Sequence, residues 1–182
     1  MSIKIVAISG SLRADSYNTK LLRAFKNLAS SDVDIDILNI SNLPLFNEDL
    51  EANFPQVAWD LKKKIEEADA VIFASPEYNR GITSALKNAV DWASRPWGKN
   101  SFEGKVVAVT GASSGAIGTA VSQQDLKKIM LYLDSYVIGQ PEFFLGIAQN
   151  KFDETGNVID EKTKEHITGF LEVIISRVKQ VK

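Results

Sequence analysis

The sequence predicts an α/β domain built on a doubly wound parallel sheet, and three observations support this fold class. Short apolar runs typical of buried strands alternate with longer stretches whose apolar residues recur at helical spacing. Several runs are continuously apolar, as in strands covered by helices on both faces. Small and polar residues follow three of the runs, at the carboxyl ends where such sheets carry ligand sites. No repeat or linker divides residues 1–182, so we expect a single domain.

Five strands are expected. The third and fourth are continuously apolar, and the first is apolar apart from Lys4. The second alternates with period two as an outer strand would, and the fifth is weak. They fall at residues 3–8, 33–38, 70–74, 106–109 and 136–138.

Helical stripes lie between these strands and after the last one. Ser16 or Asn18 can cap the first helix and Asp160 the last. The stretch from residue 41 to 55, interrupted by Pro44, reads as a packed loop. The stripes predict helices over residues 20–29, 56–68, 82–93 and 117–133, and from 161 to the region of Val178.

Net charge and the content of cysteine and histidine argue against several classes of protein function. A formal charge of −2 argues against a general nucleic-acid or membrane-surface binder. The absence of cysteine excludes thiolate nucleophiles, disulfides and Cys-based metal sites, and the single His166 is expected on a helix surface. We found no long apolar span and no leader-like start, so we expect a soluble, cytoplasmic protein.

The stretch after the first strand has the residues of an anion site. Gly10 frees the backbone to turn, Ser11 and Ser16 offer hydroxyls, Asn18 an amide and Arg13 a guanidinium. The start of the following helix adds unpaired N–H groups and the positive end of its dipole. Each residue alone is equally typical of a capped turn with a surface arginine. Their concentration in one loop favours a phosphate site.

Two further loops follow the third and fourth strands. The first, residues 75–81, contains Pro76, Tyr78 and Asn79, which combine a fixed turn, an aromatic plane and an amide. The second, residues 111–118, is rich in Gly and Ser, so its backbone N–H groups can approach a planar ligand closely. Taken alone, the first loop is equally typical of a capped turn, and the second of a flexible surface loop. Their shared position at one sheet edge favours a ligand site.

Two other known kinds of motif are similar to these loops. A phosphate loop of the nucleoside-triphosphatase type needs a glycine-lysine pair, which residues 10–18 lack. Residues 110–115 resemble the cofactor loop of short-chain dehydrogenases, but they follow the fourth strand, and no tyrosine is followed four residues later by lysine. A GxGxxG fingerprint is also absent, so a dinucleotide-binding domain fits poorly.

Taken together, these motifs resemble the NADPH-dependent FMN reductase family of flavodoxin-like proteins, close to its bacterial quinone and chromate reductases. The resemblance covers nearly the whole chain. It rests on Gly10-Ser11-Leu12-Arg13 with Ser16 and Asn18, on Pro76-Glu77-Tyr78-Asn79, on residues 111–118, on Lys87-Asn88-Ala89-Val90-Asp91-Trp92 and on Pro141-Glu142-Phe143.

The resemblance implies a flavodoxin-like five-stranded parallel sheet of order 2-1-3-4-5 with helices on both faces. It also implies an FMN site made by all three loops. The phosphate would be held by Ser11, Arg13, Ser16 and Asn18, the ring and ribityl chain would be lined by Pro76, Glu77, Tyr78 and Asn79, and Ser113, Ser114 and Gly115 would approach the ring.

The implied function is an NAD(P)H-dependent FMN oxidoreductase that passes two electrons to quinones or similar acceptors (azo, nitro, chromate) by a ping-pong mechanism. FMN would carry the chemistry, so no catalytic side chain and no metal are expected, and the motifs do not choose between NADPH and NADH. The resemblance further implies a homodimer or homotetramer, for which Trp92, Trp97 and Phe102 suit either a subunit contact or the core.

The alternative is a non-enzymatic, flavodoxin-type FMN electron carrier that exchanges electrons with protein partners. A carrier of this kind favours a strongly acidic docking surface, and a formal charge of −2 offers little of that.

Overall fold

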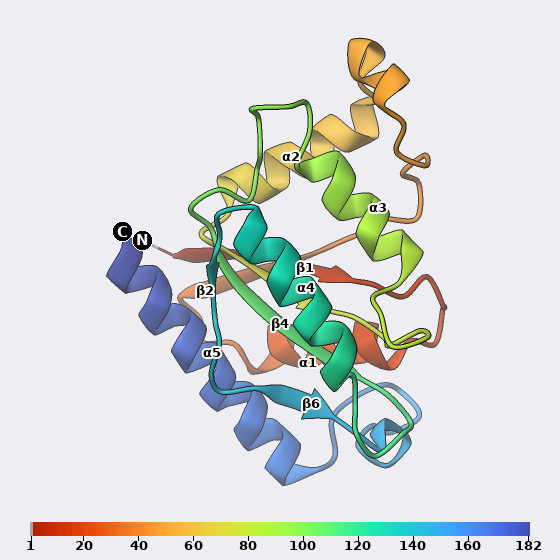
Figure 1. The fold of residues 1–182 in the computed structure, drawn as a ribbon. Coiled ribbons are helices and arrows are strands. Elements are labelled where there is room, and N and C mark those ends of the chain that lie inside the picture. The colour runs from red at the N-terminus through yellow and green to blue at the C-terminus, as the bar shows by residue number, and fades with distance from the viewer. Residues whose placement is uncertain (1) are drawn as a thin grey trace.

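A parallel sheet forms the centre of the molecule in the computed structural model, which describes residues 2–182 (Figure 1). Its four main strands are β1 (Ile3–Ser9), β2 (Val33–Leu38), β3 (Ala70–Ala74) and β4 (Val106–Ala112). The strand order is β2-β1-β3-β4-β5, and every neighbouring pair is parallel. This confirms the doubly wound fold and the predicted order.

The outer position next to β4 is divided between two short strands, which corrects the expected count of five. β5 (Tyr136–Val137) pairs with the start of β4, and β6 (Phe143–Leu145) pairs with its end. Pro141 lies between them and has no backbone N–H to donate to a strand ladder. A single continuous fifth strand is therefore disfavoured there.

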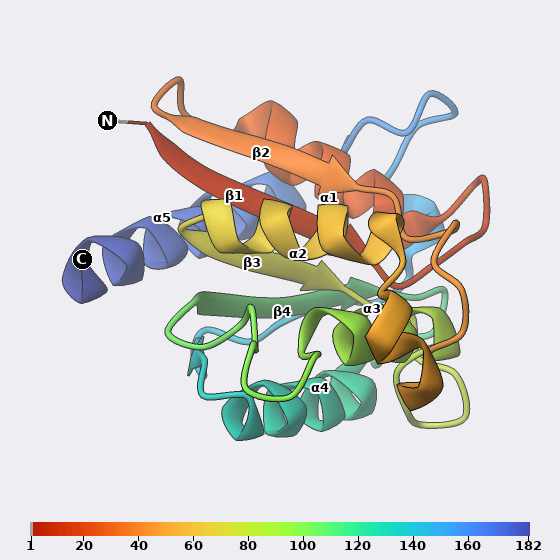
Figure 2. The same cartoon turned by 90° about the horizontal axis from the view of Figure 1, so that it is seen from above.

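Helices cover both faces of the sheet, as Figure 2 shows from above. Side chains of α1 and α5 share one buried apolar cluster with one face of the sheet, and those of α2, α3 and α4 share a second cluster with the other face. The helices are α1 (Tyr17–Leu28), α2 (Gln56–Glu67), α3 (Ser84–Ala93), α4 (Ala120–Tyr132) and α5 (Glu161–Val181).

The continuous apolar run of β1 is explained by these two layers. Ile5 and Ala7 belong to the cluster with α1 and α5, whereas Val6 and Ile8 belong to the cluster with α2, α3 and α4. Each large side chain buried in this way stabilises the fold by about 1.5–3 kcal/mol. A polar residue at any of the four positions would face a buried layer.

Several boundaries differ from the expected ones for local reasons. Helix α1 begins at Tyr17 and not at Lys20, because Ser16 caps it. Helix α4 begins at Ala120 and not at 117, since Gly118 has a φ of +71°, outside the right-handed helical region. The packed loop before α2 contains a short 3₁₀ helix, η1 (Glu48–Asn53).

Trp92, Trp97 and Phe102, the aromatic residues that suit a subunit contact or the core, differ in their exposure. Trp92 and Phe102 are fully buried, and the Trp92 indole N–H donates to the Pro44 carbonyl at 2.7 Å. Trp97 is 78% exposed. Only Trp97 of the three thus lies on the surface of this chain.

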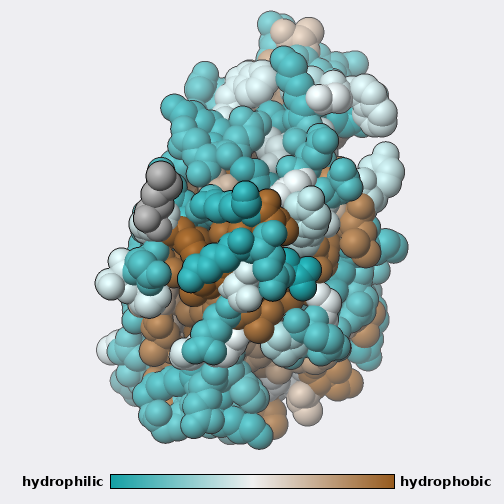
Figure 3. All heavy atoms as spheres, turned by 90° about the vertical axis from the view of Figure 1, so that its left-hand side faces the viewer, coloured by the Kyte–Doolittle hydropathy of each residue, from teal (hydrophilic) through white to brown (hydrophobic). Residues whose placement is uncertain are grey.

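The face next to the two chain ends lies at the amino ends of the strands. Hydrophilic residues cover most of it, with hydrophobic ones gathered near its middle (Figure 3). His166 is exposed on α5, as expected. Within residues 2–182 no helix combines the length and the apolar character needed to cross a membrane.

Candidate functional site

The candidate residues gather at the edge where the parallel strands β1, β3 and β4 end. Two contacts fasten the first two loops together: the Gly10 N–H donates to the Ala74 carbonyl at 2.8 Å, and the Thr83 hydroxyl donates to the Gly10 carbonyl at 2.6 Å. A methyl group on Gly10 would lie 3.1 Å from Ser75 Oγ. A side chain at position 10 would therefore be tightly packed against its neighbours, whereas the φ of Gly10 is not in the left-handed region that would require glycine.

Ser16 ends the first loop and caps α1. Its Oγ accepts from the N–H groups of Asn18 and Thr19 at 3.2 and 3.4 Å, and the residue is 2% exposed. No residue among 2–182 accepts the Ser16 hydroxyl proton, which leaves it for a ligand. The Arg13 side chain makes no ion pair within residues 2–182 and lies in an exposed part of the loop. Together they leave donors and positive charge at the start of α1.

A lysine that the sequence analysis assigned only to the helix also belongs to this loop. Lys20 Nζ contacts the Asp15 carboxylate at 2.5 Å and lies 5.6 Å from the centre of the Tyr17 ring. The Lys20 hydrogen bond lowers the pKa of Asp15 below its ordinary value. The negative charge of Asp15 is thereby offset beside the proposed anion site.

Asn18 joins the first loop to the third. Its Nδ2 donates to the Ala112 carbonyl at 3.0 Å, and its Oδ1 accepts from the Ala112 N–H at 2.9 Å. The residue is 3% exposed and 94 positions from its partner. One amide hydrogen remains for a ligand, so the side chain first holds the two loops at a fixed separation.

The second loop contains a tight hairpin turn. Tyr78 and Gly81 exchange two backbone hydrogen bonds of 3.0 Å, and the two residues between them, Asn79 and Arg80, have φ values of 52° and 66°. Two positive φ values define a type I′ turn. Pro76 is buried beneath it, while Tyr78 is 52% exposed.

Glu77, just before the turn, caps α4. Its Oε2 accepts from the N–H groups of Val121 and Ser122 at 3.0 and 3.1 Å, and its Oε1 contacts Arg80 at 3.2 Å. Thr119, the residue before α4, makes no side-chain cap of its own. This capping contact joins segments 44 positions apart, so no local pattern in the sequence predicts it.

The third loop is held by Ser113 and by close packing at Gly111. The Ser113 hydroxyl donates toward the carbonyls of Gly118 and Gly115, at 2.9 and 3.2 Å. A methyl group on Gly111 would overlap Thr119 Oγ1 and the Ser75 carbonyl. Beyond Ser113, the residues Ser114 and Gly115 are exposed and line the edge.

A buried amide oxygen lies beneath this loop. Gln123 Nε2 donates to Thr119 Oγ1 and to the Phe143 carbonyl, each at 3.0 Å, whereas its Oε1 has no partner within the described residues. An ordered water bound to this oxygen would need enough space and at least two polar partners. Because Gln123 is fully buried, its side chain offers no group to a ligand at the exposed edge.

This donor set fits FMN. A helix start, two hydroxyls and an exposed guanidinium suit a phosphate dianion. The exposed Tyr78 and the small residues 113–115, which follow the neighbouring strands β3 and β4, suit a planar ring with a polar edge. Residues 2–182 hold no cluster of three or more His, Asp or Glu side chains arranged for a metal ion.

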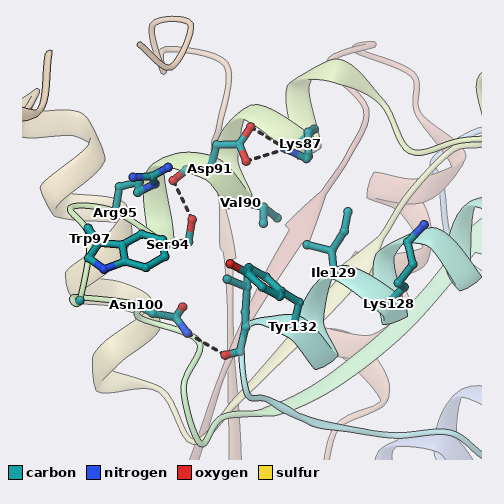
Figure 4. A pocket seen from close by; sticks show the side chains of 12 residues that line it. Lys87, Val90, Asp91, Ser94, Arg95, Trp97, Asn100, Lys128, Ile129 and Tyr132 are labelled. Atoms are coloured by element: carbon teal, nitrogen blue, oxygen red, sulfur yellow. Dashed lines mark hydrogen bonds and ion pairs between the residues drawn. The ribbon is translucent and has the colours of Figure 1, made fainter. Parts of the chain in front are cut away.

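A separate groove lies between α3, α4 and the loop at 94–100. It measures about 690 Å³, and Val90 of α3 and Ile129 of α4 project into the space between their helices (Figure 4). Trp97 and Tyr132, 78% and 77% exposed, border it. Because none of the predicted FMN contacts line it, this groove is separate from the candidate site.

Comparison with known proteins shows the family of the chain. Residues 3–150 match the model of the NADPH-dependent FMN reductase family. The chain is 42% identical over 172 residues to a 2-hydroxy-1,4-benzoquinone reductase from Burkholderia sp, covering 94% of both chains. It is 45% identical over 172 residues to an NADPH:quinone oxidoreductase from Arabidopsis thaliana, covering 91% of this chain and 86% of the relative.

A solved structure is also similar. The flavoenzyme NAD(P)H:(acceptor) oxidoreductase FerB from Paracoccus denitrificans superposes with a TM-score of 0.92 at 38% identity, covering 98% of each chain. These matches extend over the whole edge site and over both helical layers. The chain therefore belongs to the NADPH-dependent FMN reductase family, and it is an FMN-dependent oxidoreductase with NAD(P)H as the electron donor.

Proposed function

We propose that this protein passes two electrons from NAD(P)H to quinones, with FMN held at the carboxyl edge of the sheet. The observation that carries the proposal is the fastening of three loops at that edge: Thr83 to Gly10, Asn18 to Ala112, and Glu77 to the start of α4. The names of the relatives from Burkholderia sp and Arabidopsis thaliana, both reductases of quinones, support the choice of acceptor.

The phosphate of FMN is assigned to the first loop. Ser11, Arg13 and Ser16 provide hydroxyl and guanidinium donors at the start of α1, and Asn18 contributes the hydrogen of Nδ2 that Ala112 does not use. Since Lys20 offsets the charge of Asp15, the loop keeps a net attraction for a dianion.

The ring and ribityl chain are assigned to the second and third loops. Pro76 and Asn79 shape the turn, Tyr78 presents its exposed ring, and Glu77 acts by fixing the turn against α4. On the other side, the exposed backbone of Ser114 and Gly115 approaches the ring, while Ser113 holds their loop in place. Backbone N–H groups near Asn79 and Ser113 would stabilise negative charge on the reduced ring.

Bound FMN supplies the redox chemistry, taking up a hydride and later giving up two electrons. The chain itself has to bind the cofactor, keep one ring face open and hold the donors in place. No side chain at the edge forms a nucleophile and base pair, and the single His166 is exposed on α5. We therefore assign no catalytic acid, base or nucleophile.

A ping-pong order follows if one open face serves both substrates, because nicotinamide must then leave before the acceptor enters. Azo, nitro and chromate compounds are proposed as further acceptors, since an open face admits many shapes. The donor is NADPH or NADH. The cytoplasmic location stays a prediction.

We also propose a homodimer or homotetramer. Support comes from the groove between α3 and α4, where the exposed Trp97 and Tyr132 lie beside Val90 and Ile129. Exposed aromatic side chains of this kind are enriched in contacts between subunits.

A steady-state panel tests the proposal. NADPH and NADH are each combined with benzoquinone, an azo dye, chromate and free FMN, and initial rates are measured at several fixed acceptor concentrations. Double-reciprocal plots against NADPH should be parallel for benzoquinone, and high quinone should inhibit competitively with NADPH. Intersecting lines together with a ternary complex in equilibrium binding would exclude the single shared face.

A further inference from the structure

Ile147 has a backbone conformation that its side chain disfavours. Its φ is 50°, in the left-handed region, where a β-branched residue is a genuine outlier. The other non-glycine residues with positive φ within residues 2–182 are Asn79, Arg80 and Asp134, none of which is β-branched. Strain of this kind persists where the surroundings impose it, and it concentrates at functional sites.

Hydrogen bonds fasten Ile147 to the third loop of the edge site. Its N–H donates to the Gly115 carbonyl at 3.1 Å, and the next N–H, of Ala148, donates to the Ser113 carbonyl at 3.0 Å. The preceding Gly146 is so close to Ala116 that a methyl group there would overlap the Ala116 carbonyl. The left-handed turn is thus set by the backbone of residues 113–116, and glycine or asparagine at 147 would meet its demands with less strain.

The Ile147 side chain does not compensate for this strain by full burial. It is 43% exposed, at the same edge as three other exposed apolar side chains: Leu12 at 58%, Tyr78 at 52% and Ile117 at 63%. One comes from each loop after β1, β3 and β4, and Ile147 comes from the segment after β6. Each of the four segments at this edge therefore carries an exposed apolar side chain.

We propose that Ile147 is a specificity-determining residue for the electron acceptor. Its side chain forms an apolar wall beside Ser113–Gly115 that favours quinones carrying alkyl groups or a fused ring over small unsubstituted ones. This inference rests on the proposed function and names the residue that selects within its substrate class. Removing apolar contact of this size from a pocket changes discrimination about 10-fold or more.

The test uses two variants at position 147 and two controls. Ile147→Asn and Ile147→Gly both suit the left-handed backbone but remove the apolar wall. Ile147→Val keeps the wall, and Ile159→Asn makes the same chemical change at another exposed isoleucine, on the segment before α5. For each protein we would measure four quantities: the melting temperature without FMN, the FMN dissociation constant, the rate of reduction by NADPH, and kcat/KM for 2-methyl-1,4-naphthoquinone and 1,4-benzoquinone.

The expected result separates specificity from structure. In the Asn and Gly variants, kcat/KM for 2-methyl-1,4-naphthoquinone relative to 1,4-benzoquinone falls about 10-fold, whereas FMN binding and reduction by NADPH are unchanged. Their melting temperatures stay at the wild-type value or rise by about 2–4 °C as strain is relieved. Ile147→Val and Ile159→Asn keep the wild-type acceptor ratio.

An unchanged acceptor ratio in both variants would overturn the proposal, and so would a lowered melting temperature in both, since Ile147 would then be a packing residue. Failure of the proposed function is distinguishable, because it would appear in the wild-type protein as no reduction of either quinone.

Discussion

The proposed role of Arg13, binding the FMN phosphate, can be tested by a single substitution. Its guanidinium makes no ion pair within residues 2–182, so its removal breaks no ion pair of the described residues. If it binds the FMN phosphate, Arg13→Ala should weaken FMN binding by about 1–3 kcal/mol, the range for a charge-assisted hydrogen bond. A fluorescence titration with FMN measures the change.

The exposed Arg177 of α5 provides a matched control for this substitution. Arg177→Ala removes the same charge from the other end of the chain and should leave the FMN dissociation constant unchanged. Equal dissociation constants in wild type and Arg13→Ala would remove Arg13 from the phosphate site.

Two glycines should respond to alanine in opposite directions. Gly111 lies against Thr119 Oγ1 and the Ser75 carbonyl, so Gly111→Ala should reduce the free energy of unfolding by about 1–3 kcal/mol or prevent folding. Gly169 lies inside α5 with no atom near its missing methyl group, so Gly169→Ala should raise the free energy by about 0.5–1 kcal/mol. Urea unfolding measures both, and a tolerated Gly111→Ala would contradict the packing described at the end of β4.

At the scale of elements, Glu77 joins the turn after β3 to α4. Glu77→Ala would leave the N–H groups of Val121 and Ser122 without their acceptor, which should lower the free energy of unfolding by about 0.5–2 kcal/mol, the range for loss of a helix cap. Glu77→Gln retains an acceptor oxygen and should cost less. If both variants unfold at the same urea concentration as the wild type, Glu77 does not cap α4 in solution.

Asp160 makes the start of α5 sensitive to acid. Hydrogen bonds from Thr163, and then from Lys151, hold the pKa of Asp160 at about 2, below its ordinary value of 3.8. Because the folded pKa is the lower one, the stabilisation is fully present above about pH 3.8 and is lost as the pH falls through about 2.

Asp160→Asn isolates this effect, since asparagine also caps helices but carries no charge. The melting temperature of the wild type should fall more steeply than that of Asp160→Asn between about pH 3.8 and pH 2. Parallel pH profiles would show that the charge of Asp160 contributes nothing to α5.

At the scale of the whole molecule, the parts of the fold that local pattern defines were predictable. The buried runs of β1, β3 and β4 follow from two-sided burial, and the resemblance supplied the strand order that the structure confirms. The same topology brings the loops with Ser11, Tyr78 and Ser113 to one edge, which is why three separate motifs could be read as one site.

The parts that depend on distant partners were not predictable. β6 exists because residues 143–145 meet the end of β4, and its three residues show no strand period of their own. Asn18 gave the signal of a cap or phosphate ligand but pairs with Ala112, whose backbone groups carry no side-chain signature. Ile147 looks like an ordinary apolar residue until its φ is known.

The measurement that tests the central claim most directly is a two-step anaerobic mixing experiment on the FMN-loaded protein. NADPH or NADH is added first in stoichiometric amount, and 1,4-benzoquinone is added after the absorbance near 450 nm has settled. We predict bleaching within seconds of adding the nicotinamide and full return of the yellow colour on adding the quinone, with one quinone reduced per FMN. A protein that binds FMN but stays yellow with both nucleotides would contradict the account.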